Sequence, residues 1–386
     1  MTTALACLKF GHDVVVLEAA EAFREIGAGI QLPPNAMTVF QTLGLSDALR
    51  AVSFRPDAIE TRLGISGKTI FRVPLKDTAG RPPYLHIHRA DYISVLYNAL
   101  KDQDRADIRF SSEVARYETR DEEVVVKLKT GEEISGDVLV GADGIHSTLR
   151  TQMFGTDPAQ FTGHVAWRCV VPLSSLKTPP PPTACAWFGQ GKHAVTYRIR
   201  KGELVNFVGV IEQDNWRDES WQSQGQSSEL ISDFSSWHPI IEDILKACGS
   251  EGLFKWALYD RPPLSTWSDG RAVLLGDAAH SMLPFMAQGA AMAVEDAWCL
   301  ASLLSREDLS IQDIFHQYEA LRLPRIIKVQ KTSTHNGKIF HRKSRLAQFL
   351  TYGPMWIAGK LTPSLIRSRL NWLYSYDIVS EMKSKR

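Results

Sequence analysis

The stretch that decides the fold is Leu274-Leu-Gly-Asp277-Ala-Ala-His-Ser-Met-Leu-Pro284-Phe-Met-Ala-Gln-Gly289-Ala290, which continues into Val-Glu-Asp-Ala at 294–297. It reads as an apolar strand that ends in Gly-Asp, a loop with a proline, and an amphipathic helix. The aspartate can accept a hydrogen bond from a ribose-type hydroxyl, and the free N–H groups of Gly289 and Ala290 favour an anion in front of the helix. Gly-Asp alone is a common strand-end turn. With Pro284 and Gln-Gly at these spacings, it indicates a nucleotide-cofactor site.

Two other apolar runs predict strands of the same layer. One is 14–17, which follows a helical segment at 1–10 and is ended by Glu18, and the other is 138–140, which runs into Asp143. Continuous apolar strands suit a parallel sheet covered on both faces. A helix, a buried strand and then an acid form the second half of a dinucleotide-binding unit, in which the acid binds a ribose hydroxyl. A surface acid at the end of a strand is an equally good interpretation of Glu18.

The rest of the 386-residue chain predicts an insertion into this layer. We expect an α/β fold in which a Rossmann-like layer, truncated at its first strand, carries an inserted β-sheet substrate domain and C-terminal helices. The predicted boundaries are 1–160 and 266–335 for the two parts of the nucleotide-binding domain, 161–265 for the sheet domain and 336–386 for a helical end.

Composition excludes several classes of protein. A formal charge of +1 gives no basic excess for nucleic acid or an anionic membrane, and no run of about 18 apolar residues predicts a spanning helix. The five cysteines contain no C-x-x-C, so we expect buried thiols, no disulfide framework, no metal site, and a reducing, cytoplasmic location. The apolar run 346–376 predicts core or the surface of a homodimer.

Four segments, in order along nearly the whole chain, resemble motifs of the single-component flavoprotein aromatic hydroxylases, the salicylate hydroxylase-like and para-hydroxybenzoate hydroxylase-like family. Segment 274–297 resembles their second FAD motif, and segment 138–147 resembles their Asp-Gly motif, which touches flavin and nicotinamide. Segment 27–36 matches the loop after the ribose acid in the fungal branch. His88-Arg-Ala-Asp91 matches a segment whose arginine binds FAD.

The resemblance implies bound FAD, with NADPH or NADH as co-substrate. The implied cofactor contacts are Glu18, Gly29, Gln31, Arg89, Asp143, Asp277, Gly289 and Ala290. Family members begin with a strand and G-x-G-x-x-G before the helix that here starts at Met1, and this sequence contains neither. His280 beside the second motif is expected to be structural and satisfied by backbone.

Two strands of the inserted sheet supply the expected catalytic residues. Alternation puts Arg168 on the face of Ala166 and Val170, and Tyr197 on that of Val195 and Ile199. The resemblance implies that the arginine holds a phenolate and that the tyrosine orients the ring. A solvated arginine and a core tyrosine are the alternatives from the residues alone.

These residues lead to three hypotheses. The first is hydroxylation of a phenol-type aromatic with NAD(P)H and O2 through a flavin C4a-hydroperoxide. The second is epoxidation of an indole or alkene by a protein of the same family. The third is an inactive homologue that does not retain FAD.

Overall fold

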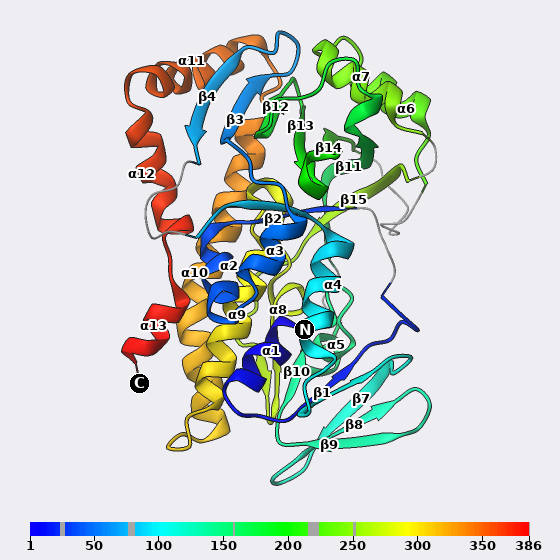
Figure 1. The fold of residues 1–386 in the computed structure, drawn as a ribbon, viewed down its shortest axis with the longest axis vertical. Coiled ribbons are helices and arrows are strands. Elements are labelled where there is room, and N and C mark those ends of the chain that lie inside the picture. Colours follow the sequence, from blue (N-terminus) through cyan, green and yellow to red (C-terminus); the bar gives the residue numbers. More distant parts are fainter. Residues whose placement is uncertain (24–27, 76–81, 157–158, 215–223, 250–251, 386) are drawn as a thin grey trace.

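The computed structural model describes residues 1–23, 28–75, 82–156, 159–214, 224–249 and 252–385. Figure 1 shows a sheet with its covering helices at one end, a layer of long helices through the middle, and small β-sheets at the other end. The mixed α/β fold predicted from the sequence is confirmed.

The largest sheet has seven strands in the order β15-β11-β14-β13-β12-β3-β4. Its members are β15 (Phe254–Asp260), β11 (Gln160–Pro172), β14 (Leu204–Glu212), β13 (Lys192–Ile199), β12 (Ala184–Phe188), β3 (Ala58–Leu63) and β4 (Thr69–Pro74). Every pairing is antiparallel except that of β12 with β3. The sheet therefore takes in the β3–β4 hairpin, which the sequence had placed in the first part of the nucleotide-binding domain.

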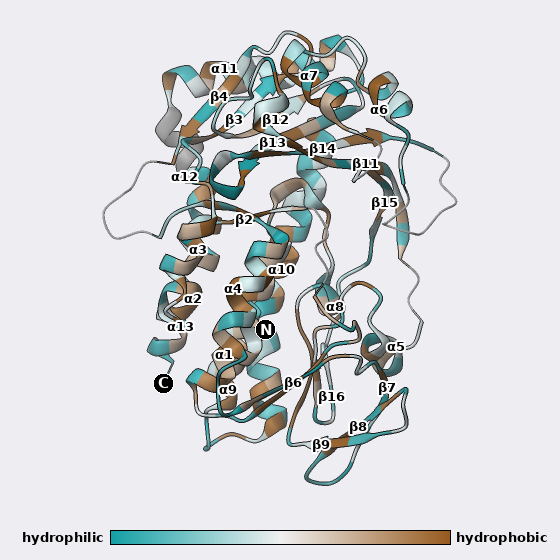
Figure 2. Cartoon of the chain, turned by 45° about the vertical axis from the view of Figure 1, so that its right-hand side comes forward, coloured by the Kyte–Doolittle hydropathy of each residue, from teal (hydrophilic) through white to brown (hydrophobic). Residues whose placement is uncertain are grey.

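Helices cover both faces of this sheet (Figure 2). On one side lie α6 (Ser227–Asp233) and α7 (Pro239–Ala247), which pack with Trp167 and Trp187 in one core cluster. On the other side the sheet faces α9 (Gly289–Leu304) and α10 (Ile311–Phe340). The candidate site lies on this second side.

The parallel layer is built in two separate pieces. Strand β1 (Val14–Leu17) pairs with β6 (Ala106–Arg109), and β10 (Leu139–Gly141) pairs with β17 (Ala272–Leu274), which also pairs with β16 (Ser268–Asp269). The prediction of fully buried strands was wrong for β1, because its one partner among the described strands is β6 and Val15 is 44% exposed. Strand β17 is fully buried, as expected.

In the helical layer, helices from both ends of the chain pack on α9. Helix α9 contacts α1 (Thr2–Lys9), α2 (Pro34–Thr42), α10 and α13 (Ile378–Ser384). Nearby lie α3 (Ser46–Val52), α4 (Arg89–Leu100), and the pair formed by β2 (Gly29–Leu32) with β5 (Leu85–His88). The loop expected at the start of segment 27–36 is thus a strand from Gly29 to Leu32, and residue 27 lies outside the described ones.

The remaining elements complete the periphery. They are β7 (Val114–Thr119), β8 (Val124–Leu128), β9 (Glu133–Gly136), α5 (Thr148–Phe154), α8 (Asp277–His280), α11 (Arg345–Leu361) and α12 (Pro363–Tyr374). No helix of the described ranges combines the length and the apolar character needed to cross a membrane.

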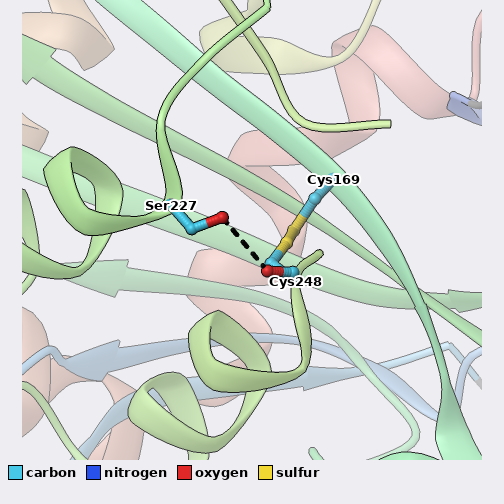
Figure 3. The surroundings of a disulfide bond; sticks show 3 residues. All are labelled: Cys169, Ser227 and Cys248. Atoms are coloured by element: carbon cyan, nitrogen blue, oxygen red, sulfur yellow. Dashed lines mark hydrogen bonds between the residues drawn. A yellow bond between two sulfur atoms is a disulfide. The ribbon is translucent and has the colours of Figure 1, made fainter. Parts of the chain in front are cut away.

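The cysteines correct one expectation. Cys169 on β11 and Cys248 at the end of α7 form a disulfide, next to which the Ser227 hydroxyl donates to the Cys248 carbonyl (Figure 3). Cys7, Cys185 and Cys299 are buried thiols, as predicted. The prediction of unpaired cysteines failed because residues 79 apart in sequence meet where α7 packs on the sheet. The disulfide also removes one argument for a reducing compartment.

Candidate active site

The backbone at the start of the second motif requires glycine. Gly276 has φ +60° and ψ −141°, a conformation that residues with a Cβ rarely adopt. A Cβ there would also lie 3.1 Å from the Cβ of Ala293 on α9. The turn therefore holds α9 close to the end of β17 and directs Asp277 to the start of that helix.

Asp277 lies at the N-terminus of α9. Its side chain is accessible to solvent, yet surrounding protein raises its pKa, an effect that His280 partly opposes. A Cβ on Gly289 would lie 3.8 Å from Asp277 Oδ1. Helix α9 has no side-chain cap, and Nε2 of the buried Gln288 has no hydrogen-bond partner. The positive end of the helix therefore lies next to a carboxylate and a free amide donor.

A buried ionic network supports this helix end. Arg322 of α10 donates to Asp296 Oδ1 and Glu295 Oε2, both at 2.7 Å, and all three side chains are fully buried. Asn35 of α2 donates to Glu295 Oε1 at 2.6 Å. The expected backbone partner of His280 was wrong: its Nε2 lies 2.6 Å from Asp296 Oδ2, so the histidine belongs to this network. The network fixes α2, α9 and α10 to one another.

The second part of the candidate site is one face of the large sheet. The loop before α9 packs on this face, because Leu283 and Phe285 share a cluster with Ala166 of β11 and Val210 of β14. Arg168 is on the same face as Ala166, and register places Tyr197 opposite Asn206 of β14. Both predicted side chains therefore lie on the face that the flavin-type motif covers.

Gly29 brings β2 against Tyr197. Its N–H donates to Asn206 Oδ1 at 2.9 Å, and a Cβ at Gly29 would lie 2.5 Å from Cε2 of the tyrosine. A side chain at this position would displace the ring. The Tyr197 ring therefore requires glycine at position 29, so the predicted catalytic residue packs directly on a predicted cofactor residue.

Arg168 is a buried cation beside a second one. Burial lowers its pKa, the Tyr197 phenol raises it, and the positive charge of Arg89 lowers it. Its guanidinium carbon lies 4.7 Å from the ring centre of Trp256, and its Nε is buried without a hydrogen-bond partner. The unpaired Nε–H of Arg168, next to the positive charge of Arg89, therefore favours an anionic ligand.

An aromatic row continues from Tyr197. The ring of His86 lies 4.8 Å from that of Tyr197, and burial lowers the pKa of His86 to about 3. Tyr84 packs on His86 and donates to Gln31 Oε1 at 2.5 Å. Burial raises the pKa of Tyr197 above its ordinary value, so the phenol stays protonated. Sequence reasoning did not assign His86 to the site, although it lies on β5 two residues before His88 of the Arg89 motif.

The remaining predicted residues are spread over the edges of this region. Glu18 ends β1 and accepts from the Ala20 N–H at 2.9 Å, and the charge of the Met1 amino group acts on it. Arg89 begins α4 and its N–H donates to the Ala28 carbonyl at 2.7 Å. Asp143 is exposed and accepts from the Leu149 N–H at 3.3 Å. The structure thus brings Arg168, Tyr197, Arg89 and Gly29 together, and separately brings Asp277 to Gly289 and Ala290 at the start of α9.

Comparisons with known proteins decide the family. The family model described as an FAD binding domain matches residues 1–333. A 3-amino-4-hydroxybenzoate 2-monooxygenase of Streptomyces platensis is 35% identical over 98% of this chain and 93% of its own length. The chain belongs to the FAD-dependent aromatic monooxygenases. A 3-hydroxybenzoate 6-hydroxylase of Aquipseudomonas alcaligenes is 33% identical and covers 99% of this monooxygenase and 96% of its own length.

Solved structures agree with this assignment. A salicylate hydroxylase substrate complex superimposes with a TM-score of 0.80 at 26% identity, over 99% of this monooxygenase and 94% of the other chain. HpxO of Klebsiella pneumoniae, complexed with FAD and uric acid, gives 0.81 at 25% identity over 92% and 90%. FAD is therefore the cofactor and NAD(P)H the reductant typical of the family. A place in the fungal branch stays a prediction, because these relatives are bacterial or of unstated source.

Proposed function

We propose that this monooxygenase uses NAD(P)H and O2 to hydroxylate a small phenol-type aromatic that binds as an anion. The observation that carries the proposal is the position of Arg168 and Tyr197 on the sheet face covered by the loop before α9. An unpaired cationic donor and an aromatic wall there suit a phenolate ring. The named substrates of the relatives include 3-hydroxybenzoate and 6-hydroxynicotinate, which are hydroxylated aryl carboxylates.

The residues present fit FAD. The uncapped end of α9 and the unpartnered Gln288 Nε2 offer donors, and the accessible Asp277 carboxylate beside Gly289 offers an acceptor. We assign Asp277, Gly289 and Ala290 to the flavin half, and Glu18 and Arg89 to the remainder of the cofactor, with Gly29, Gln31 and Asp143 at its margins. When bound, FAD supplies the activation of O2 that no side chain can provide.

The side chains of this chain hold the substrate in its reactive state. Arg168 stabilises the phenolate, and one such donor at an oxyanion is worth about 3–4 kcal/mol. The charge of Arg89 strengthens the attraction for an anion. Tyr197 stays protonated and presents its ring to the substrate, so it orients the aromatic and does not act as a base.

Retention of the cofactor is tested by an absorbance spectrum of the purified chain with added FAD. We expect a bound yellow chromophore that survives gel filtration and is bleached by NADH or NADPH under anaerobic conditions. A colourless protein after gel filtration would support the inactive-homologue hypothesis instead.

The role of Arg168 is tested with Arg168→Ala on a panel of hydroxybenzoates, with products measured by mass spectrometry. Loss of about 3 kcal/mol predicts a fall in kcat/KM of at least 100-fold with FAD still bound. Arg72→Ala on β4 is the control, because Arg72 is half exposed on the same sheet. Epoxidation of an alkene or indole needs no phenolate, so unchanged turnover in Arg168→Ala would favour that activity.

We also propose that α11 mediates a homodimer. Leu346, Phe349, Leu350, Ile357 and Leu361 are each more than half exposed along this helix, whose other side packs on β4. Light scattering should give twice the 43.2 kDa mass of the chain, and Phe349→Lys should give the monomer. A monomeric parent protein at micromolar concentration would contradict this assembly.

A further inference from the structure

A second group of polar side chains lies on the same sheet face, away from the candidate active site. His164 of β11, Glu212 at the end of β14 and His341 after α10 each offer one ligand atom, and these three atoms lie within 4.8 Å of one another. His164 is four residues from Arg168 on one strand, which corresponds to about 13 Å. The group is therefore distinct from the residues assigned to substrate and flavin.

The hydrogen bonds around His164 fix its free nitrogen. The Thr162 hydroxyl donates its proton to the Leu258 carbonyl at 2.8 Å, so it can only accept from His164 Nδ1, which lies 3.2 Å away. Nδ1 of His164 then carries the proton, and Nε2 keeps a lone pair. This is the tautomer that a metal-binding imidazole needs, with its outer nitrogen anchored by a hydrogen bond.

His341 has the complementary arrangement. Its Nε2 lies 2.6 Å from Nδ1 of the buried His193, and its Nδ1 is buried without a hydrogen-bond partner, 3.7 Å from Glu212 Oε1. When His341 Nε2 carries the proton and donates it to His193 Nδ1, His341 Nδ1 keeps a lone pair. His341 Nδ1 and Glu212 Oε1 are too far apart for a hydrogen bond, and the space between these two atoms can hold an ion.

The third ligand, Glu212, offers one carboxylate oxygen to an ion. Lys343 contacts Glu212 Oε2 at 2.6 Å and is largely exposed, which leaves Oε1 for an ion but places a competing cation beside it.

We propose that His164, Glu212 and His341 bind a divalent transition metal ion such as Zn²⁺, with His193 as the outer partner of His341. Two imidazoles and a carboxylate are a ligand set that zinc accepts with a fourth position left for water. The ion would connect β11, β14 and the end of α10. It would also lie beside Phe285, whose ring is 5.7 Å from that of His164. Its role is to fix this end of the substrate domain, apart from the flavin chemistry.

The test uses the full chain, stripped of metal with a chelator and supplied with FAD, and titrated with Co²⁺ under equilibrium dialysis. We expect one Co²⁺ per chain, the visible d–d bands of a low-coordinate site in the difference spectrum, and displacement by Zn²⁺. His164→Gln and His341→Gln should weaken binding by about 100-fold or more, and His193→Gln by about 10–100-fold. His316→Gln, an exposed histidine on α10, is the matched control and should bind as the parent does.

A second variant avoids any loss of folding. Lys343→Ala removes an exposed competing charge and should tighten Co²⁺ binding by about threefold to tenfold. Substoichiometric binding by the parent, equal affinity of His164→Gln and His316→Gln, or weaker binding by Lys343→Ala would each overturn the proposal. The outcome does not depend on hydroxylase activity.

Discussion

At the scale of the residue, Gly29 connects the cofactor side of the site with the substrate side. Its missing Cβ makes room for the Tyr197 ring, which would otherwise lie 2.5 Å away. Gly29→Ala must therefore move the tyrosine or β2. We expect a fall in kcat of about tenfold or more on the preferred phenol, measured by steady-state kinetics with bound flavin checked by absorbance.

A second glycine-to-alanine variant, at a position without a steric conflict, shows whether crowding of Tyr197 causes the effect of Gly29→Ala. Gly353 lies in α11 with no atom outside its chain neighbours near the position of its Cβ, so Gly353→Ala should leave kcat unchanged. If Gly29→Ala turned over as fast as Gly353→Ala, the close approach of β2 to Tyr197 would have no catalytic consequence.

Single residues were predictable where a local pattern fixes them. Strand alternation placed Arg168 and Tyr197 on their faces, and the Gly-Asp spacing located Asp277 at the helix start. His164, Glu212 and His341 come from three distant segments, so no spacing along the chain signals them. The Cys169–Cys248 pair escaped for the same reason.

At the scale of the element, the position of α9 depends on the buried ion network below its first turns. Burial alone would raise the pKa of Asp296, but His280 and Arg322 outweigh it and hold the pKa below its ordinary value. A lowered carboxylate pKa stabilises the fold above the unfolded value, and that stabilisation is lost as pH falls through the folded value. Acid should therefore loosen α9 and α10.

Removal of the central cation tests this network. Arg322→Ala leaves two buried carboxylates without their shared partner, and we expect a loss of about 3–5 kcal/mol in the free energy of unfolding, measured with denaturant. Arg120→Ala is the control, because Arg120 is half exposed and surface pairs contribute about 0–1 kcal/mol. Similar stability of the two variants would mean that packing, and not the ions, holds α9.

Elements were predictable where periodicity is strong, and less so where tertiary pairing decides. The helices α1 and α9 were predicted from the helical segment 1–10 and from the amphipathic pattern after Gly289. Segment 27–36 was expected to be a loop, and Gly29–Leu32 is a strand because β5 pairs with it over four residues. The β3–β4 hairpin lies within the first predicted domain in sequence, but its membership of the large sheet depends on the distant β12.

At the scale of the whole molecule, the proposed cofactor residues come from both ends of the matched domain. Glu18 and Arg89 precede the strands β11 to β15 of the large sheet in sequence, and Asp277 to Ala290 follow them. A ligand that contacts both parts stabilises the folded chain by mass action. Saturation at 100 times Kd is worth about 2.7 kcal/mol, so FAD should raise the unfolding midpoint measured by denaturant titration.

The contribution of Asp277 to this linkage can be isolated. Asp277→Asn keeps the shape of the side chain but removes the charge that accepts from a flavin hydroxyl, so the stabilisation by a fixed FAD concentration should fall by about 1–2 kcal/mol. Asp102→Asn, an exposed carboxylate after α4, should respond to FAD as the parent does. Without FAD, Asp102→Asn should unfold close to the parent, and Asp277→Asn should be at least as stable as the parent, because the raised pKa of Asp277 means that burial disfavours its charge in the folded chain. An FAD-dependent shift that is equal in both variants would place the cofactor away from Asp277, and with it away from the N-terminus of α9.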